Sequence, residues 1–327
     1  MSTYSFGKGL PTYNGVPMIG GFPMGLTKTF FVDYGNGSDG VSEKANSVSR
    51  PWKTIAKAEG LITSNKNEGI ALMGNSTHTL TEMLTVDKNR MHIFGYDPGG
   101  RSYGQNAKVS LGATGVATDT ATIRNTGVRN SFVNMKVMNS NTVAQALHSF
   151  EDGGEYTVMD ACEIYKSSLL TTNLTAELLC NGDSSQYINC TFGDLVNQRG
   201  GSGKERPNVK LDRETLTGKV CRDVTFTNCT FLHKAAHANA CFFYGHNATD
   251  VERRLVLINP VFWNCVLAAA DPADCVNFAT AQTTGDVLLV NPVGINIGYL
   301  GGASLNIYVQ GAVPTESSTG IAVECTT

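Results

Sequence analysis

The sequence predicts an all-β chain folded as a parallel β-helix, a solenoid in which short strands stack coil upon coil. Composition is the first observation: charged residues make up only 16% of the 327 residues while glycine occurs 35 times, which favours strands and turns over helices. The second is a phrase, asparagine followed by an apolar segment, that recurs along the chain. The third is a set of short apolar segments, such as Ala240–Tyr244, that precede its copies.

The phrase is clearest at Tyr187–Leu195 (YINCTFGDL) and Phe226–Lys234 (FTNCTFLHK). With weaker copies included, six positions align: Asn134, Ala161, Asn189, Asn228, Asn259 and Asn291. The shortest spacing between them, 27 residues, cannot hold the four strands of a propeller blade, so a parallel β-helix is favoured. We expect the five asparagines to point inward and form a ladder of buried, hydrogen-bonded amides. The phrase is then a packing feature and not a catalytic motif.

Residues 1–29 differ from the rest, because they are rich in glycine and proline yet also apolar. We expect an extended assembly arm without regular secondary structure. Such an arm would bury its apolar side chains against a partner; an arm folded back on its own domain is the alternative. The side chains expected to contact a partner are Tyr4, Phe6, Leu10, Tyr13, Met18, Ile19, Phe22 and Met24.

The β-helix domain is expected to cover residues 30–327. It begins with an apolar strand and a turn-rich loop, Phe30–Gly40. A capping helix is expected near residues 51–63, because Ile55, Ala58 and Leu61 keep helical spacing after Pro51. That helix would cover the open end of the first coil. Coils should follow from about residue 70 to about residue 310, the limits of the repeated strand pattern.

Three strings in Phe30–Glu82, FFVDYGNGSDG, PWKTIAKAEGLI and GIALMGNSTHTLTE, carry a resemblance. They resemble the N-terminal entry of pectate-lyase-like right-handed parallel β-helix proteins, which include phage tailspikes and other virion proteins. The resemblance implies a right-handed coil. For a protein of the virion type it also implies a homotrimer.

Carboxylates lining one face of the coils would indicate a polysaccharide lyase or hydrolase. The main candidates are Asp152, Asp160 and Asp183; Glu151 and Glu155 lie close to the first two in the sequence, and Asp194 could stack one coil later together with Asp183. Asp152 and Asp183 stand beside glycines, where aspartate also serves the backbone of a turn. Asp160 precedes an aligned position and is expected to point outward. The carboxylate pattern is therefore a weaker indication than the repeat.

Metal and cofactor sites are not expected. A calcium site would need the oxygen ligands of one loop, Asp33, Asn36, Ser38 and Asp39, for which a plain turn is the alternative. His233 and His237 lack the glutamate of a zinc-binding H-E-x-x-H motif. The nine cysteines form no C-x-x-C pair and are expected to be reduced, buried thiols, which implies assembly in a reducing host cytoplasm.

The function expected from these features is structural and not enzymatic. We expect a phage virion protein on the capsid surface, a capsid-decorating or cement protein whose arm binds the major capsid protein or another virion protein. With a net charge of −3 and no long apolar segment, neither nucleic acid nor a membrane is an expected partner. The alternative is a carbohydrate-active β-helix enzyme, or a glycan-binding tailspike-type protein, acting on host surface polysaccharide.

Deleting residues 1–26 tests the assembly arm. The remaining chain should stay folded, because the arm lies outside the predicted coils, but it should no longer join the particle. Thermal melting measures the folding, and co-purification with the particle measures incorporation. Retained incorporation would refute the arm hypothesis.

Overall fold

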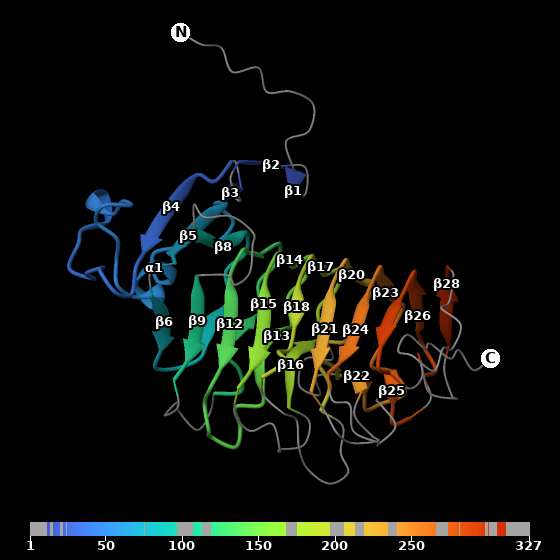
Figure 1. Ribbon diagram of the computed structural model, residues 1–327. Helices are drawn as coiled ribbons and strands as arrows, with labels where there is room; N and C mark the ends of the chain where they lie inside the picture. The colour runs from blue at the N-terminus through green and yellow to red at the C-terminus, as the bar shows by residue number, and fades with distance from the viewer. Residues whose placement is uncertain are drawn as a thin grey trace, which may run out of the picture.

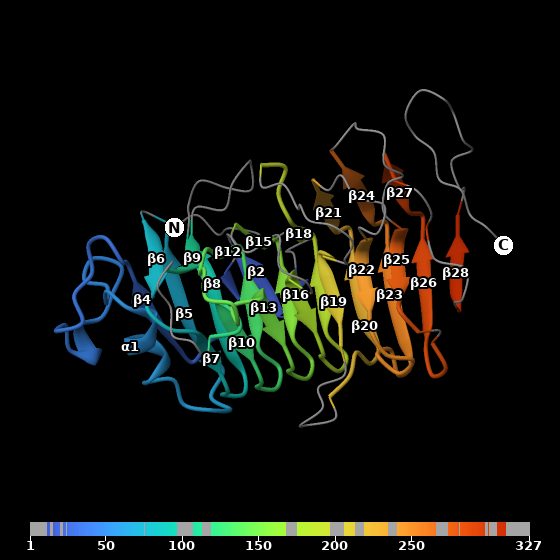
Figure 2. The same cartoon turned by 90° about the horizontal axis from the view of Figure 1, so that it is seen from below.

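A computed structural model describes the chain at residues 12–13, 16–19, 22–23, 25–74, 76–96, 107–112, 119–167, 175–196, 206–212, 219–234, 241–265, 274–280, 282–297, 300 and 306–311. Three parallel sheets wind around one core as a right-handed parallel β-helix, from β4 at one end to β28 at the other (Figure 1). The predicted fold class is confirmed. Each coil passes through a seven-stranded, then a ten-stranded, then an eight-stranded sheet, whose strands lie side by side in Figure 2.

The strands of each sheet pair in parallel with the equivalent strands of the neighbouring coils. The seven-stranded sheet contains β7 (Leu84–Val86), β10 (Ile123–Asn125), β13 (His148–Asp152), β16 (Ala176–Cys180), β19 (Val209–Leu211), β22 (Cys241–Gly245) and β25 (Asp274–Phe278). The ten-stranded sheet contains β4 (Lys28–Val32), β5 (Glu68–Met73), β8 (Met91–Tyr96), β11 (Ser131–Val133), β14 (Val158–Asp160), β17 (Gln186–Ile188), β20 (Val224–Thr227), β23 (Arg254–Ile258), β26 (Asp286–Val290) and β28 (Ile307–Gln310). The eight-stranded sheet contains β6 (Thr77–Leu80), β9 (Lys108–Leu111), β12 (Lys136–Asn139), β15 (Glu163–Lys166), β18 (Thr191–Phe192), β21 (Thr230–His233), β24 (Val261–Asn264) and β27 (Val293–Ile295).

Equivalent side chains of successive coils stack inside the helix. Phe192, Phe231 and Phe262 each lie three residues after an aligned asparagine, and their ring centroids are 5.3 Å apart at both steps. Tyr187 and Phe226 stack in the same way at 4.4 Å. Burying a side chain of this kind stabilises the fold by about 1.5–3 kcal/mol. The aromatic columns therefore bind one coil to the next.

A left-handed residue stands at the turn between the ten-stranded and eight-stranded sheets in six coils. Its φ lies between 49° and 53° at each aligned position: Asn134, Ala161, Asn189, Asn228, Asn259 and Asn291. Residues with a Cβ avoid this conformation, and asparagine tolerates it better than most. The repeated asparagine is thus explained by the backbone of a tight turn.

The asparagines form a ladder, but it runs along the outside of the helix. The amide nitrogens of Asn228, Asn259 and Asn291 each donate to the amide oxygen of the asparagine one coil earlier, at 3.5, 2.9 and 3.2 Å. The expectation of inward, buried amides is wrong: Asn134 is half-buried, and Asn189 and the other three are exposed. A residue at the corner of the coil directs its side chain away from the core.

Helix α1 (Ile55–Glu59) covers the N-terminal end of the core. Thr54 caps it, and the side chains of Ile55 and Ala58 are buried. The helix is shorter than the expected 51–63, because Trp52 is bridged in parallel to Val32 and remains in extended backbone. A single 3-10 turn, η1 (Glu43–Ala45), precedes it.

Residues 1–29 contain regular structure that the sequence did not predict. β1 (Thr12–Tyr13), β2 (Val16–Ile19) and β3 (Phe22–Pro23) pair antiparallel in a small sheet, drawn above the ten-stranded sheet in Figure 1. Proline is tolerated in such short edge strands. The expectation of an irregular arm is therefore wrong for these residues. β4 already begins at Lys28, inside the predicted arm.

The base of the arm packs on the chain's own domain. Ala71, Phe94 and Val133 point away from the main core and form a second buried cluster, against which Leu26 packs. For Leu26 this favours the alternative of an arm folded on its own domain. Of the expected partner contacts, the backbones of Tyr13, Met18, Ile19 and Phe22 lie in strands, whereas Tyr4, Phe6, Leu10 and Met24 lie outside the described residues. Contact of the arm with a partner stays a prediction.

The eight cysteines in the described part of the chain are free thiols, and seven are buried. Cys162, Cys190 and Cys229 directly follow left-handed residues, and their sulfur atoms lie 3.3 to 3.6 Å from backbone carbonyl oxygens. They fill the inner side of the bend as small apolar side chains. Among the described residues, no helix is long and apolar enough to cross a membrane.

Two substitutions test the role of the left-handed turn. Asn189→Leu should lower the free energy of unfolding by about 1–2 kcal/mol, because leucine tolerates positive φ poorly and breaks the ladder. Ala161→Asn should raise it by about 1 kcal/mol, because asparagine suits the same φ. Urea unfolding measures both, and equal stability of the two variants would contradict this explanation.

Candidate functional site

Asp152 is the centre of a hydrogen-bonded network inside the coil. Its carboxylate accepts from the hydroxyls of Tyr187 at 2.7 Å and Thr157 at 2.8 Å, and from the amide of Asn125 and the N–H of Gly154, both at 3.1 Å. Asp152 has no exposed surface. Burial, and then the Asp152 charge, raise the pKa of Tyr187 well above its usual value. Asp152 is thus a fully partnered structural residue.

Asp160 and Asp183 lie at two different corners of the coil. Asp160 ends β14 and accepts from the amide of Asn189 at 3.1 Å, at the turn before the eight-stranded sheet. Asp183 stands at the turn before the ten-stranded sheet and pairs with Arg222 at 3.0 Å. The structure therefore does not bring the three predicted carboxylates together in one site.

A row of side chains runs along the outer face of the seven-stranded sheet. Strand register aligns seven residues, which we call the outer row: Thr85, Arg124, Glu151, Leu179, Lys210, Tyr244 and Asn277. The residues that precede three of them, Phe150, Leu178 and Val209, belong to the core. Because side chains alternate along a strand, the outer row points away from the core.

Two ion pairs lie along the outer row. Arg124 Nε is 2.6 Å from Glu151 Oε2, across the adjacent strands β10 and β13. Lys210 Nζ is 2.7 Å from Asp212 Oδ2. The side chains of Glu151 and Lys210 are only 9% exposed, whereas those of Arg124 and Asp212 are 37% and 31% exposed. The row therefore presents two accessible charged groups, the guanidinium of Arg124 and the carboxylate of Asp212. Each is paired with a largely buried partner, Glu151 or Lys210.

His148, the first residue of β13, lies near the cations of this sheet and near Lys166 of the eight-stranded sheet. Burial, and then the positive charges of Lys210, Lys166 and Arg124, lower its pKa well below the usual value. Its Nδ1 is buried without a hydrogen-bond partner in the described part of the chain. The imidazole is therefore neutral at physiological pH and can accept a proton or a hydrogen bond.

This arrangement suits an anionic, extended ligand. Arg124, whose side chain is 37% exposed, can bind a carboxylate through charge-assisted hydrogen bonds, which are stronger than neutral ones, whereas Lys210 would have to exchange its Asp212 partner for one. Tyr244 stands in the same row, but it is only 3% exposed. His148 is a buried, neutral base near these cations, with 4% of its surface exposed. The strands succeed one another at about 4.8 Å, so the row offers contacts at regular intervals.

Of the charged residues of the outer row, Glu151 was among the candidate carboxylates, but Arg124 and Lys210 were not predicted, although a signal existed. Arg124, Glu151 and Leu179 each stand ten residues before the aligned turn position of their coil. In the coil of Lys210 the interval is 18 residues, because extra residues separate β19 from β20. The signal therefore fails where a loop is inserted.

The loop considered for calcium uses its carboxylates for the backbone. Asp33 Oδ1 accepts from the N–H groups of Gly35 and Asn36 at 2.9 and 3.1 Å. Asp39 accepts from the N–H groups of Lys53 and Thr54 at 2.9 and 3.0 Å. The plain-turn alternative accounts for both residues. Nowhere in the described ranges do three or more His, Cys, Asp or Glu side chains gather in a way that could hold a metal ion.

The fold is shared with solved structures of low sequence identity. No protein-family model and no curated protein matches the chain. It is similar to a pectin methylesterase from Aspergillus niger, with a TM-score of 0.58 and 13% identity over 94% of this chain and 91% of that one. It is similar to the pectate lyase Pel9A, with a TM-score of 0.56 and 14% identity over 82% of this chain, but it spans only 63% of that lyase. A mutant pectin methylesterase in complex with a hexasaccharide gives a TM-score of 0.53 at 14% identity, over 86% and 80% of the two chains.

These likenesses confirm the resemblance to pectate-lyase-like β-helix proteins at the level of the fold. They also contradict the expectation that the chain is not an enzyme, because the structures that share its fold are a pectate lyase and pectin methylesterases. That expectation rested on the lack of a carboxylate cluster in the sequence. The order of residues in the sequence does not show the outer row, because its members come together only through strand register.

Asp152→Ala tests the structural assignment of the best-buried predicted carboxylate. Four donors would lose their acceptor inside the coil, so the free energy of unfolding should fall by roughly 3 kcal/mol. Chemical denaturation measures the loss, with Asp183→Ala, at a half-buried residue whose partner is a surface arginine, as a control that should cost less than about 1 kcal/mol. An Asp152→Ala protein as stable as the control would contradict the network.

Proposed function

We propose that this chain is a carbohydrate-active β-helix enzyme that acts on an acidic polysaccharide along the outer row. The observation that carries the proposal is the set of cations around the neutral His148: Arg124 and Lys210 of the seven-stranded sheet and Lys166 of the eight-stranded sheet. The likeness to a pectate lyase and to pectin methylesterases supports it, since pectin is a uronate polymer.

The geometry favours a reaction that begins with proton abstraction. Arg124 and Lys210 stand three strands apart, about 14 Å, so they would bind carboxylates of different sugar units of one chain. Their positive charges would stabilise the negative charge that develops when a proton beside a bound carboxylate is removed. His148 would accept that proton, and a carbon–carbon double bond would form as the C–O bond to the leaving sugar breaks with its electron pair on the oxygen, which would take a proton from solvent water.

Hydrolysis by paired carboxylates is supported less well. Such hydrolysis needs two carboxyl groups on either side of one glycosidic bond. Glu151 is bound to Arg124, and Asp212 follows a strand two positions further along the sheet. The outer row therefore supports elimination better than hydrolysis.

A virion role remains a second proposal. Its support is the sequence resemblance to phage virion proteins and the apolar side chains on the outer face of the eight-stranded sheet, where Trp263 and Val293 are 37% and 40% exposed. An exposed apolar surface of this kind suits contact with another virion protein or with further copies in a homotrimer. A glycan-active virion protein of tailspike type would combine both proposals.

Binding of polygalacturonate tests the proposed function. Arg124→Ala and Lys210→Ala should each weaken binding about tenfold or more, about 1.4 kcal/mol, because each removes a cation from the row. Arg254→Ala is the matched control, since that arginine is 71% exposed on a different sheet. Calorimetry measures the affinity, and the ultraviolet absorbance of an unsaturated product measures turnover, which His148→Ala should abolish. Absence of both binding and turnover in the unchanged protein would overturn the proposal.

A further inference from the structure

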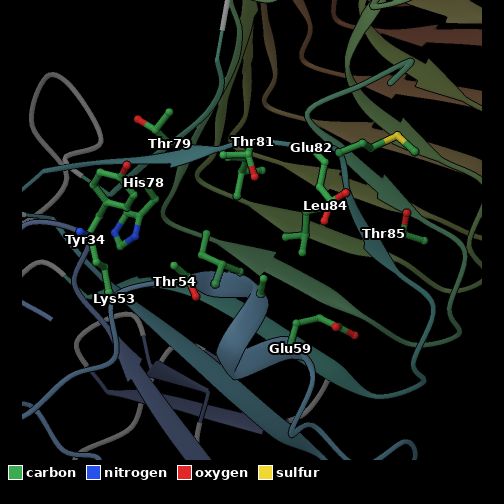
Figure 3. A pocket seen from close by; sticks show the side chains of 14 residues that line it. Tyr34, Lys53, Thr54, Glu59, His78, Thr79, Thr81, Glu82, Leu84 and Thr85 are labelled. Carbon is green, nitrogen blue, oxygen red and sulfur yellow. The ribbon is translucent and has the colours of Figure 1, made fainter. Parts of the chain in front are cut away.

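A cavity of about 510 Å³ opens between helix α1 and the segment from β6 to β7. In Figure 3, Thr54 and Glu59 line it from the side of α1, and Thr79, Thr81 and Thr85 from the opposite side. Its volume is in the range of small-molecule sites. None of its lining residues belongs to the ion pairs of the outer row.

The floor of the cavity is formed by buried residues. Ile55, His78 and Leu84 are 2%, 1% and 7% exposed, and all three line the cavity. Ile55 and Leu84 are apolar, so His78 is the polar group among the three. A ligand that reaches the floor would therefore meet two hydrocarbon side chains and one imidazole.

His78 has one nitrogen in use and one without a partner. Its Nε2 lies 2.9 Å from the carbonyl oxygen of Met73, and a carbonyl can only accept, so Nε2 carries the proton. Its Nδ1 is buried and has no hydrogen-bond partner among the described residues. Burial also lowers the pKa of His78, which keeps the ring neutral. The floor thus holds a buried acceptor to which no described residue donates.

The rim indicates a hydroxylated ligand without net charge. Thr79, Thr81 and Thr85 are exposed there and offer hydroxyl groups that both donate and accept. The charged side chains of the rim have opposite signs, Lys53 against Glu59 and Glu82, so neither sign of ligand is selected. A sugar ring combines hydroxyl groups at its edge with hydrocarbon faces, which matches this lining.

We propose that this cavity binds a small neutral saccharide, one hydroxyl of which donates to His78 Nδ1. The apolar face of the sugar packs on Ile55 and Leu84, and its other hydroxyl groups bond to the threonines of the rim. The site is separate from the proposed enzymatic function, because it neither needs the cations of the outer row nor involves bond breakage. It would anchor the N-terminal end of the β-helix to a neutral glycan.

The test titrates the full-length chain with glucose, galactose, N-acetylglucosamine, lactose and cellobiose, followed by saturation-transfer NMR and calorimetry. Ala56→Trp fills the cavity from α1, where Ala56 is exposed, and should abolish binding. Lys57→Trp places the same side chain on the same helix outside the lining and should bind as the unchanged protein does. His78→Phe keeps a ring but removes the acceptor, and should weaken binding at least about tenfold. Circular dichroism and melting verify that each variant folds.

Binding of at least one of these sugars that is lost in Ala56→Trp and retained in Lys57→Trp supports the site. Three outcomes overturn it: no sugar of the panel binds at millimolar concentration, so that the cavity holds water only; Ala56→Trp binds as the unchanged protein does; or only polygalacturonate binds and salt displaces it. The last outcome leaves the proposed function intact, and a failure of polygalacturonate binding leaves this site intact.

Discussion

The fold depends on a backbone constraint that recurs once per coil: the chain turns from the ten-stranded into the eight-stranded sheet through a single left-handed residue. Because this turn has the same length in each of these coils, strands of successive coils are held in the same register. The register in turn stacks Phe192, Phe231 and Phe262 in one column and aligns the parallel hydrogen bonds. A change in length at this corner would shift side chains from the core to the surface, whereas loops elsewhere vary freely.

A second left-handed column stands at the other corner, between the seven-stranded and ten-stranded sheets. Its residues are Arg90, Arg129, Tyr156, Ser184 and Asp223, with φ between 50° and 60°. The two corners flank the ten-stranded sheet, and the second corner directly follows the seven-stranded sheet, whose outer row carries Arg124, Glu151 and Lys210. The proposed chemistry therefore needs no dedicated motif, because fixed register alone brings charges from distant parts of the chain into line.

Sequence reasoning located the coils because one corner prefers asparagine, and the repeat at Asn189 and Asn228 is visible without coordinates. It misjudged the direction of those side chains, since a left-handed turn and a buried ladder select the same residue type. The second corner escaped notice, because Arg129, Tyr156 and Ser184 share no residue type. The outer row escaped for a related reason: its members become neighbours only after inserted loops are removed from the count. Burial of Asp152 was equally invisible, since aspartate beside glycine also marks an exposed turn.

Ligand binding along the outer row is tested most directly by a crystal structure of the chain soaked with an acidic hexasaccharide. We expect the sugar chain to lie parallel to the helix axis over the seven-stranded sheet. Its carboxylates should contact Arg124 and Lys210, and one ring carbon should lie next to His148. Density for the sugar on another face of the helix, or a chain that crosses the sheet without touching these cations, would contradict it.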